Sequence, residues 1–304
     1  MSIIEQATRR LEELRRAGIE VPRATKTEGL ETGGAAVHPL LRIHRDPAPA
    51  HAPESAPQEP ARIAQPARLV DIDLDGLAAQ GYLTPGLVNR AMAEEFRVIK
   101  QQLLRNMDAA AAKGLRRNLI AVTSALPGEG KTFFSMNLAM SLAMEVDYHA
   151  LLVDADVLRP SVLRRYGLPE DVGLLDLATH PELDVSETLL RTNVPKLSLL
   201  PAGTPSAKSP ELLSSASVER LLTELADRYA DRIVIFDAPP ILLASGARHL
   251  ASRVGQVVMI VEADSTDSQS VAQAFAAVET CPLVSSVLNR APTLSASSYG
   301  YYDA

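Results

Sequence analysis

Hydrophobic residues are spread unevenly along the chain, and their spacing separates an N-terminal part without a core pattern from a longer part that has one. In residues 1–21, apolar side chains recur at helical spacing between charged ones, which predicts an amphipathic helix. This helix is either a docking helix or a surface helix of marginal stability. Residues 22–68 are rich in Pro, Ala and His and have little periodicity, so they are predicted to form a disordered linker.

The pattern of a folded core begins near residue 69. Apolar positions in residues 90–106 recur on one helical face, and after Gly114 short apolar runs alternate with helical stretches. The predicted strands are Asn118–Ser124, Ala150–Asp154, Leu197–Pro201, Ile233–Asp237, Val257–Glu262 and Val284–Leu288, and further helices are predicted at Phe133–Glu145, Pro210–Tyr229 and Ser268–Glu279. Because most of these strands are uninterrupted apolar runs, we expect a doubly wound, mostly parallel α/β sheet over residues 69–290. Residues 291–304 are small and polar apart from tyrosine and are predicted to form a flexible tail.

Composition narrows the classes of function. The formal net charge is −7, so a broad basic surface for nucleic acid is not expected. A single cysteine, Cys281, excludes an intramolecular disulfide and a Cys-rich zinc site. The sequence has neither a long apolar span nor a signal-peptide pattern, so a cytoplasmic location is expected.

The strongest chemical signal is the segment Ala125–Thr132, ALPGEGKT, between a predicted strand and a predicted helix. This is the pattern of a phosphate-binding loop. Gly128 and Gly130 let backbone N–H groups turn toward phosphate oxygens, Lys131 reaches the β- and γ-phosphates, and the Thr132 hydroxyl ligates Mg²⁺. The predicted nucleotide-binding residues of the loop are Pro127, Gly128, Glu129, Gly130, Lys131, Thr132 and Phe133. Ala125 replaces the usual first glycine, which is acceptable if its φ is negative.

Carboxylates follow two other predicted strands. Asp154 and Asp156 are two residues apart in VDADVLRP, and Asp237 ends the apolar run IVIFD. The carboxyl ends of parallel strands meet at one edge of a sheet, where ligands of such folds bind. Any one of these residues could be an ordinary turn aspartate, but together they predict a Mg²⁺ site beside the loop.

These motifs, in this order, resemble those of the bacterial tyrosine kinases, or exopolysaccharide tyrosine autokinases, which are related to the ParA and MinD ATPases. TSALPGEGKT is similar to their Walker A motif, VDADVLRP to Walker A′, IVIFDAPP to Walker B and SSYGYYDA to their tyrosine cluster. The resemblance spans roughly residues 90–304 and implies a P-loop NTPase fold of the ParA/MinD kind. The N-terminal helix, the linker and AEEFRVIKQQLL resemble the form associated with exosortase-type polysaccharide systems.

The resemblance implies a reaction and roles. ATP and Mg²⁺ are the implied cofactors, with Lys131 on the phosphates and Asp156 accepting the proton of a tyrosine hydroxyl. Asp154 and Asp237 serve the metal directly or through water, together with Thr132. The implied phosphate acceptors are Tyr299, Tyr301 and Tyr302. The residues implied to read the adenine base are Asn289 and, as a helper, Arg290; a turn asparagine is the other interpretation.

The family assembles into a homo-oligomeric ring through a Glu-x-x-Arg-x-x-Arg helix. Glu94, Arg97 and Lys100 match its spacing, although lysine lacks the bidentate fork of the final arginine; a solvated helical face is the other interpretation. Detached members are activated by the cytoplasmic segment of a membrane polysaccharide co-polymerase that sets chain length. The resemblance therefore implies recruitment to the inner membrane through that partner, and phosphorylation in trans.

Two alternatives remain open. A ParA- or MinD-like positioning ATPase is disfavoured because Leu126 stands where those proteins carry a lysine near the start of the loop. A non-catalytic, nucleotide-gated scaffold of the export complex is kept open by departures at Ala125, Lys100 and Leu158, the last of which replaces a family arginine. The sequence leaves open whether Arg159 takes the place of that arginine.

Overall fold

The computed structural model describes residues 68–86, 89–112, 116–206 and 209–292. The predicted N-terminal helix, residues 22–67 of the predicted linker and the tail tyrosines lie outside the described residues, whereas Arg68, predicted to end the linker, begins a strand. The strands are β1 (Arg68–Val70), β2 (Leu119–Ser124), β3 (His149–Asp154), β4 (Leu190–Thr192), β5 (Leu197–Leu200), β6 (Arg232–Asp237), β7 (Gln256–Glu262) and β8 (Val284–Asn289). The helices are α2 (Leu74–Ala79), α3 (Arg90–Ala112), α4 (Lys131–Ala143), α5 (Val162–Arg165), α6 (Leu174–Thr179), α7 (Val185–Thr188), α8 (Ser209–Leu212), α9 (Ala216–Arg228), α10 (Ser245–Ala251) and α11 (Ser268–Ala277).

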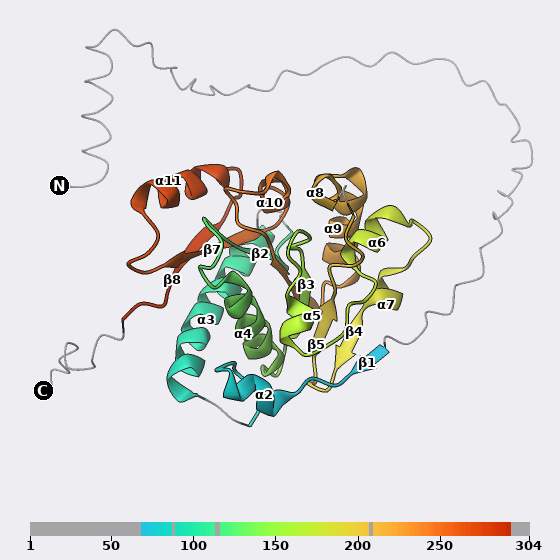
Figure 1. The fold of residues 1–304 in the computed structure, drawn as a ribbon, viewed down its shortest axis with the longest axis horizontal. Coiled ribbons are helices and arrows are strands. Elements are labelled where there is room, and N and C mark those ends of the chain that lie inside the picture. Colours follow the sequence, from blue (N-terminus) through green and yellow to red (C-terminus); the bar gives the residue numbers. More distant parts are fainter. Residues whose placement is uncertain (1–67, 87–88, 113–115, 207–208, 293–304) are drawn as a thin grey trace, which may run out of the picture. The chain divides into compact units, whose positions relative to one another are not determined.

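The strands form one sheet with the order β1-β4-β5-β3-β6-β2-β7-β8 (Figure 1). Every neighbouring pair is parallel except β4 and β5. The connections between parallel strands carry the helices, as they must in such a sheet. The predicted mostly parallel α/β fold is confirmed.

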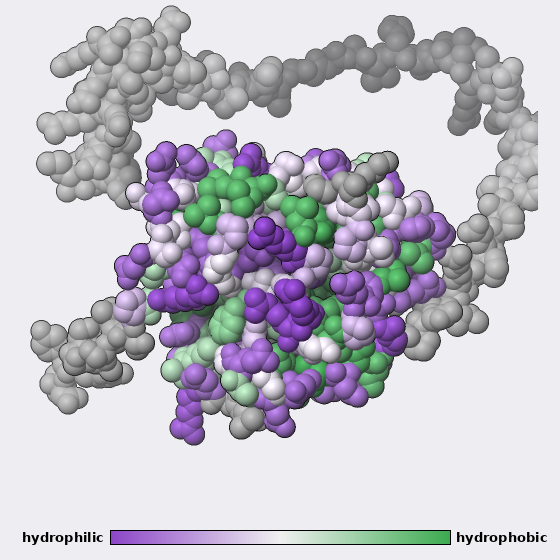
Figure 2. Space-filling view, in the orientation of Figure 1, coloured by the Kyte–Doolittle hydropathy of each residue, from purple (hydrophilic) through white to green (hydrophobic). Residues whose placement is uncertain are grey.

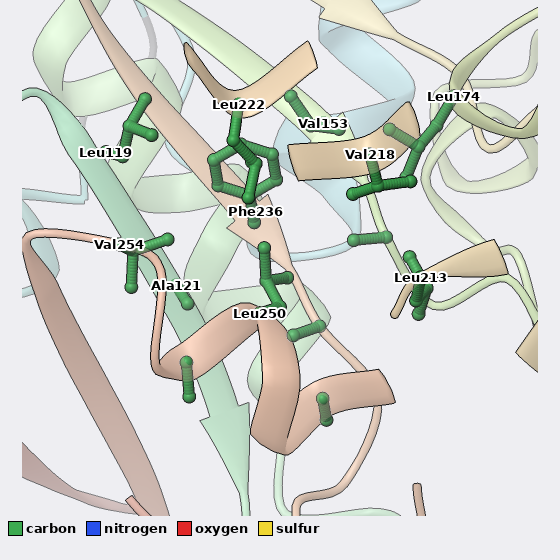
Figure 3. Packing of buried hydrophobic residues seen from close by; sticks show 14 of the residues in the cluster. Leu119, Ala121, Val153, Leu174, Leu213, Val218, Leu222, Phe236, Leu250 and Val254 are labelled. Carbon is green, nitrogen blue, oxygen red and sulfur yellow. The ribbon is translucent and has the colours of Figure 1, made fainter. Parts of the chain in front are cut away.

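Helices cover both faces of the sheet, and alternate residues of each strand supply the two cores. Leu119 and Ala121 of β2 belong to the cluster under α6, α9, α10 and α11, which Figure 3 shows around Phe236 of β6. Ile120 and Val122 belong to the cluster under α2, α3 and α4. Since successive side chains of a strand point to opposite faces, a strand buried on both sides has to be apolar throughout. This explains the uninterrupted apolar runs in the sequence.

All six predicted strands are present, with bounds shifted by at most one residue. The two strands that were not predicted, β1 and β4, have three residues each. The predicted helix over residues 210–229 is wrong as a single element, because it is divided into α8 and α9 at Ser215, whose side chain caps α9. Helix α3 extends beyond the predicted residue 106 and packs on α4 through Phe96 and Phe134, whose ring centroids are 5.3 Å apart.

Candidate functional site

The loop between β2 and α4 has the backbone that phosphate binding requires. Gly128 and Gly130 have φ values of 93° and 94°, in the left-handed region that favours glycine, and Gly130 is the N-cap of α4. The first N–H groups of a helix have no partner within the helix, so the start of α4 can donate to an anion. Among the described non-glycine residues only Lys196, Asp264 and Arg290 have positive φ, so Ala125 carries no such strain.

Glu129 braces the loop from inside. Its buried carboxylate accepts a hydrogen bond from the Leu126 N–H at 2.6 Å and another from the Thr266 hydroxyl. The backbone carbonyl of Glu129 in turn accepts a hydrogen bond from Nδ2 of Asn289 at 2.8 Å. The loop is therefore fixed to the segment after β7 and to the end of β8. The sequence indicated Glu129 only as a member of the loop, because its partner Thr266 is distant along the chain.

Asn289 and Arg290 lie at the same cavity as the loop. The Asn289 amide is so close to the loop that a Cβ on Gly130 would come within 2.1 Å of its Nδ2. The Arg290 guanidinium forms an ion pair with Glu262 at 2.6 Å. Asn289 is therefore tied to the phosphate loop, and Arg290 is tied to the end of β7. Their part in reading adenine remains a prediction.

The three predicted carboxylates converge beside the loop. Asp154 and Asp237 are register partners at the ends of β3 and β6, and Asp156 follows two residues after Asp154. Nζ of Lys131 lies 2.7 Å from Oδ2 of Asp156, with both side chains largely buried. The sequence prediction that these strand ends meet at the loop is confirmed by this geometry.

Burial and mutual repulsion destabilise the charges of this cluster. Burial, and after it the neighbouring Asp237 charge, raise the pKa of Asp154 to about 7, against hydrogen bonds from the Val162 and Ser161 N–H groups. Burial also raises the pKa of Asp237, against the attraction of Lys131. Burial lowers the pKa of Lys131, but the surrounding carboxylates outweigh it and raise that pKa above its usual value. Lys131 is therefore charged at neutral pH, but its single positive charge does not balance the negative charges of the carboxylates around it.

The hydrogen bonds of Asp154 and Asp237 show which carboxylate oxygen is free to bind a metal. Oδ2 of Asp154 accepts the N–H groups of Ser161 and Val162 at 2.9 Å each, which fixes the start of α5. Asp237 accepts from the Ser135 hydroxyl through Oδ1 at 3.1 Å, whereas its buried Oδ2 has no hydrogen-bond partner. A buried carboxylate oxygen without a partner is costly unless a ligand supplies one. Asp237 Oδ2 thus fits a cation.

The donor atoms at this site suit a Mg²⁺ ion that is held by few protein ligands. Within the described ranges, no group of three or more His, Cys, Asp or Glu side chains is arranged to hold a metal. Mg²⁺ is usually held by one or two carboxylates together with substrate phosphates and water. The Thr132 hydroxyl, which accepts a 3.4 Å hydrogen bond from Ser161, lies close enough to the Asp237 carboxylate to lower its pKa.

A cavity of about 680 Å³ opens above the loop, a size typical of small-ligand sites. Besides loop residues and Asp156, it is lined by Leu158, Arg159, Ser161, Arg164, Arg165, Pro239, Pro240, Leu243, Ala244, Asn289 and Arg290. Arg164 and Arg165 were not indicated by the sequence. They come from α5, a helix of four residues that is too short to show periodicity. Hydrophobic and hydrophilic residues are intermixed on the face that carries α5 and α10 (Figure 2).

The substituted motif positions have different surroundings. Leu126 packs partly buried against the core and offers no cation. Leu158 is exposed at the cavity, where Arg159 also lies, and the Arg159 N–H donates to Oδ1 of Asp156 at 3.2 Å. Arg159 is thus placed to bring to the cavity the positive charge that Leu158 cannot supply.

The three residues of the predicted assembly motif on α3 do not lie on one exposed surface. Glu94 and Arg97 form an exposed ion pair at 2.5 Å. Lys100, in contrast, is buried and its ammonium group contacts Glu145 and the Ser141 carbonyl. Lys100 therefore joins α3 to the end of α4, and only Glu94 and Arg97 are free to face another copy.

Comparisons with known proteins identify the family. No family model matches the chain. The chain is 30% identical over 212 residues to the tyrosine-protein kinase YwqD of Bacillus subtilis, covering 69% of this chain and 86% of the relative. It is 29% identical over 213 residues to the putative tyrosine-protein kinase CapB of Staphylococcus aureus, covering 69% and 90%. Among solved structures, the VpsO kinase domain is similar with a TM-score of 0.51 and 29% identity, covering 63% of this chain and 98% of that one. The 30% identity to the Bacillus subtilis kinase, which extends over 86% of that relative, places the chain in the family of bacterial tyrosine-protein kinases.

Proposed function

We propose that this protein is an ATP-dependent tyrosine autokinase that phosphorylates C-terminal tyrosines of a neighbouring copy and thereby regulates the chain length and export of an exopolysaccharide. The observation that carries the proposal is the contact between Lys131 and Asp156 at 2.7 Å, two residues that line the cavity. This contact brings a phosphate-binding ammonium group next to a carboxylate that can accept a proton.

The residues act in sequence on a bound nucleotide. Lys131 and the N–H groups at the start of α4 hold the phosphates, and Lys131 leaves its contact with Asp156 as it does so. Asp156 then accepts the proton of the tyrosine hydroxyl as the phenolic oxygen bonds to the γ-phosphorus. The bond between that phosphorus and the β–γ bridging oxygen breaks, and ADP leaves. Because this reaction needs mainly alignment and charge neutralisation, a fixed carboxylate suffices as the base.

Mg²⁺, when bound, neutralises phosphate charge and aligns the transferred group. Asp237 and Thr132 are the residues that would hold it, with Asp154 acting through water because its oxygens already accept backbone N–H groups.

The fold restricts which tyrosines can be acceptors. Of the seven tyrosines, four lie in the described residues, and three of these, Tyr82, Tyr166 and Tyr229, are buried. Tyr148 is partly buried. A hydroxyl enclosed in a core cannot enter an active site, which supports Tyr299, Tyr301 and Tyr302 as the acceptors.

Assembly and activation rest on the family resemblance. We place the contact between copies of the ring on Glu94 and Arg97, the exposed members of the α3 motif. The activator is the cytoplasmic segment of a membrane polysaccharide co-polymerase, which recruits the kinase to the inner membrane. In the described part of the chain, no helix is long and apolar enough to cross a membrane, in keeping with recruitment through a partner.

Purified protein incubated with Mg-ATP, with and without the co-polymerase segment, tests the proposal by the appearance of phosphotyrosine. We expect phosphotyrosine that increases with the segment. ATP hydrolysis without phosphotyrosine would instead indicate a ParA- or MinD-like ATPase. Nucleotide binding without either reaction would indicate a scaffold.

A further inference from the structure

The cavity has two chemically different sides, and the strand order explains why. Strand β2, which leads into the phosphate loop, has β6 and β3 on one side and β7 and β8 on the other. The residues that follow β3 and β6 include Asp156, Leu158 and Leu243, whereas Asn289 and Arg290 belong to the end of β8. The carboxylates therefore mark the β3/β6 side as the place where the phosphoryl group is transferred.

That side also carries exposed hydrophobic side chains. Leu158 is 53% exposed and Leu243 is 65% exposed, and both line the cavity, as do the buried Pro239 and Pro240. Of the large hydrophobic residues that are exposed in the described ranges, only these two line this cavity. Leaving two leucines in water forgoes the stabilisation that burial would provide, and such positions often mark binding sites. We call Leu158, Pro239, Pro240 and Leu243 the hydrophobic lip.

We propose that the hydrophobic lip binds the aromatic ring of the acceptor tyrosine, in the segment Tyr299–Tyr302 of a second copy of the chain, and so selects tyrosine over serine. This inference rests on the proposed function. The occupant follows from the composition of residues 293–304, which contain three tyrosines and a single charged residue, Asp303. Such a segment can be recognised by its rings far better than by its charge. Leu158 and Asp156 are two residues apart and line the same cavity, so a ring held at Leu158 can bring its hydroxyl to Asp156.

The second copy is favoured over the chain's own tail by the position of the tail's origin. The tail leaves from the end of β8, on the Asn289 side of the loop. In the same copy, the phosphate loop that follows β2 lies between this origin and the β3/β6 side that carries the hydrophobic lip. A tail from another copy can approach from the lip side directly.

A mixing experiment tests this inference with full-length protein. The enzyme copy carries Ser in place of Tyr299, Tyr301 and Tyr302, and the acceptor copy carries Lys131→Met with an intact tail, so that only transfer between copies is seen. With Leu158→Gln and Leu243→Gln in the enzyme copy, we expect the transfer rate at low acceptor concentration to fall about tenfold, the factor that roughly 55 Å² of apolar burial supplies. The same two changes in the acceptor copy should alter the rate by less than about twofold.

The matched control is Leu69→Gln in the enzyme copy. Leu69 is 64% exposed and lies on β1, at the far edge of the sheet from β8. An unchanged rate with the altered lip would overturn the inference, as would equal slowing from the acceptor copy. A parallel rise in the KM for ATP would assign the hydrophobic lip to the nucleotide instead.

A peptide competitor gives a second readout that does not depend on the variants. A peptide of residues 296–304 with Phe at the three tyrosine positions should inhibit transfer by the enzyme with an intact lip, and the same peptide with Ala should not. Equal inhibition by both peptides would contradict recognition of the ring. No transfer at all by the enzyme with an intact lip would overturn the proposed function, and the lip with it.

Discussion

Asp154 and Asp237 are register partners at the last rung between β3 and β6, so two buried carboxylates stand side by side on adjacent strands. Burial raises the pKa of both, and one of the four carboxylate oxygens, Asp237 Oδ2, has no hydrogen-bond partner. Lys131 supplies one nearby positive charge. The arrangement is costly without a ligand, and a bound Mg–nucleotide would relieve that cost.

Asp237→Asn should remove the response to magnesium. In the unchanged protein, Mg²⁺ added to ADP should raise the melting temperature by roughly 5 °C more than ADP alone, since ligands stabilise the state they bind. The variant should lose this increment because its side chain carries no negative charge for the cation. Thermal melts with ADP, with and without Mg²⁺, measure the difference. Asp231→Asn, on an exposed side chain just before β6, is the control and should keep the increment.

Lys131→Met should lower the rate of phosphotyrosine formation at least ~100-fold, because it removes a charge that meets the transferred phosphate. Phosphotyrosine detection after incubation with Mg-ATP measures this. Arg220→Met, which removes an exposed cation on α9, should leave the rate unchanged. A Lys131→Met variant as active as the Arg220→Met variant would show that the loop has another role.

A substitution at Arg97 should affect assembly, and a substitution at Lys100 should affect stability. Arg97→Glu puts a negative charge beside Glu94 on the surface of α3, and it should shift size-exclusion chromatography toward the monomer with little change in melting temperature. Lys100→Met breaks a buried contact with Glu145 and Ser141, so it should lower the melting temperature while leaving assembly of the folded protein intact. If Lys100→Met alone dissolved the oligomer, the assignment of the contact to Glu94 and Arg97 would be wrong.

The Asp184–Arg228 pair should make stability depend on pH in the acidic range. The hydrogen bond from Arg228 lowers the pKa of Asp184 to about 2, helped by the Ser186 hydroxyl and N–H. A carboxylate whose pKa is lowered by folding stabilises the fold above its unfolded pKa of about 4, and this contribution is lost as pH falls toward 2.

Asp184→Asn should therefore cost about 1 kcal/mol of unfolding free energy at pH 7, after allowing for solvent screening of this partly exposed pair, and almost nothing at pH 2. Denaturant unfolding at both pH values measures the change. Asp227→Asn, on the exposed side of α9, is the control. A cost for Asp184→Asn that stays the same at both pH values would contradict the ion pair.

The sequence predicted the phosphate loop and the convergence of Asp154, Asp156 and Asp237, because strand ends in a parallel sheet share an edge. It could not predict the Glu129–Thr266 contact, which joins residues 137 positions apart. Nor could it predict that Lys100 turns inward to Glu145, since helical spacing alone does not say which face a neighbouring helix covers. The short strands β1 and β4 were missed because three residues are too few to show a pattern.

The central claim, transfer of phosphate from the loop to tail tyrosines, is tested most directly by mapping phosphorylated residues in purified protein after incubation with Mg-ATP. The account predicts phosphate on Tyr299, Tyr301 or Tyr302, and none on the buried Tyr82, Tyr166 and Tyr229. Hydrolysis of ATP with no phosphate on any of the three tail tyrosines would contradict it.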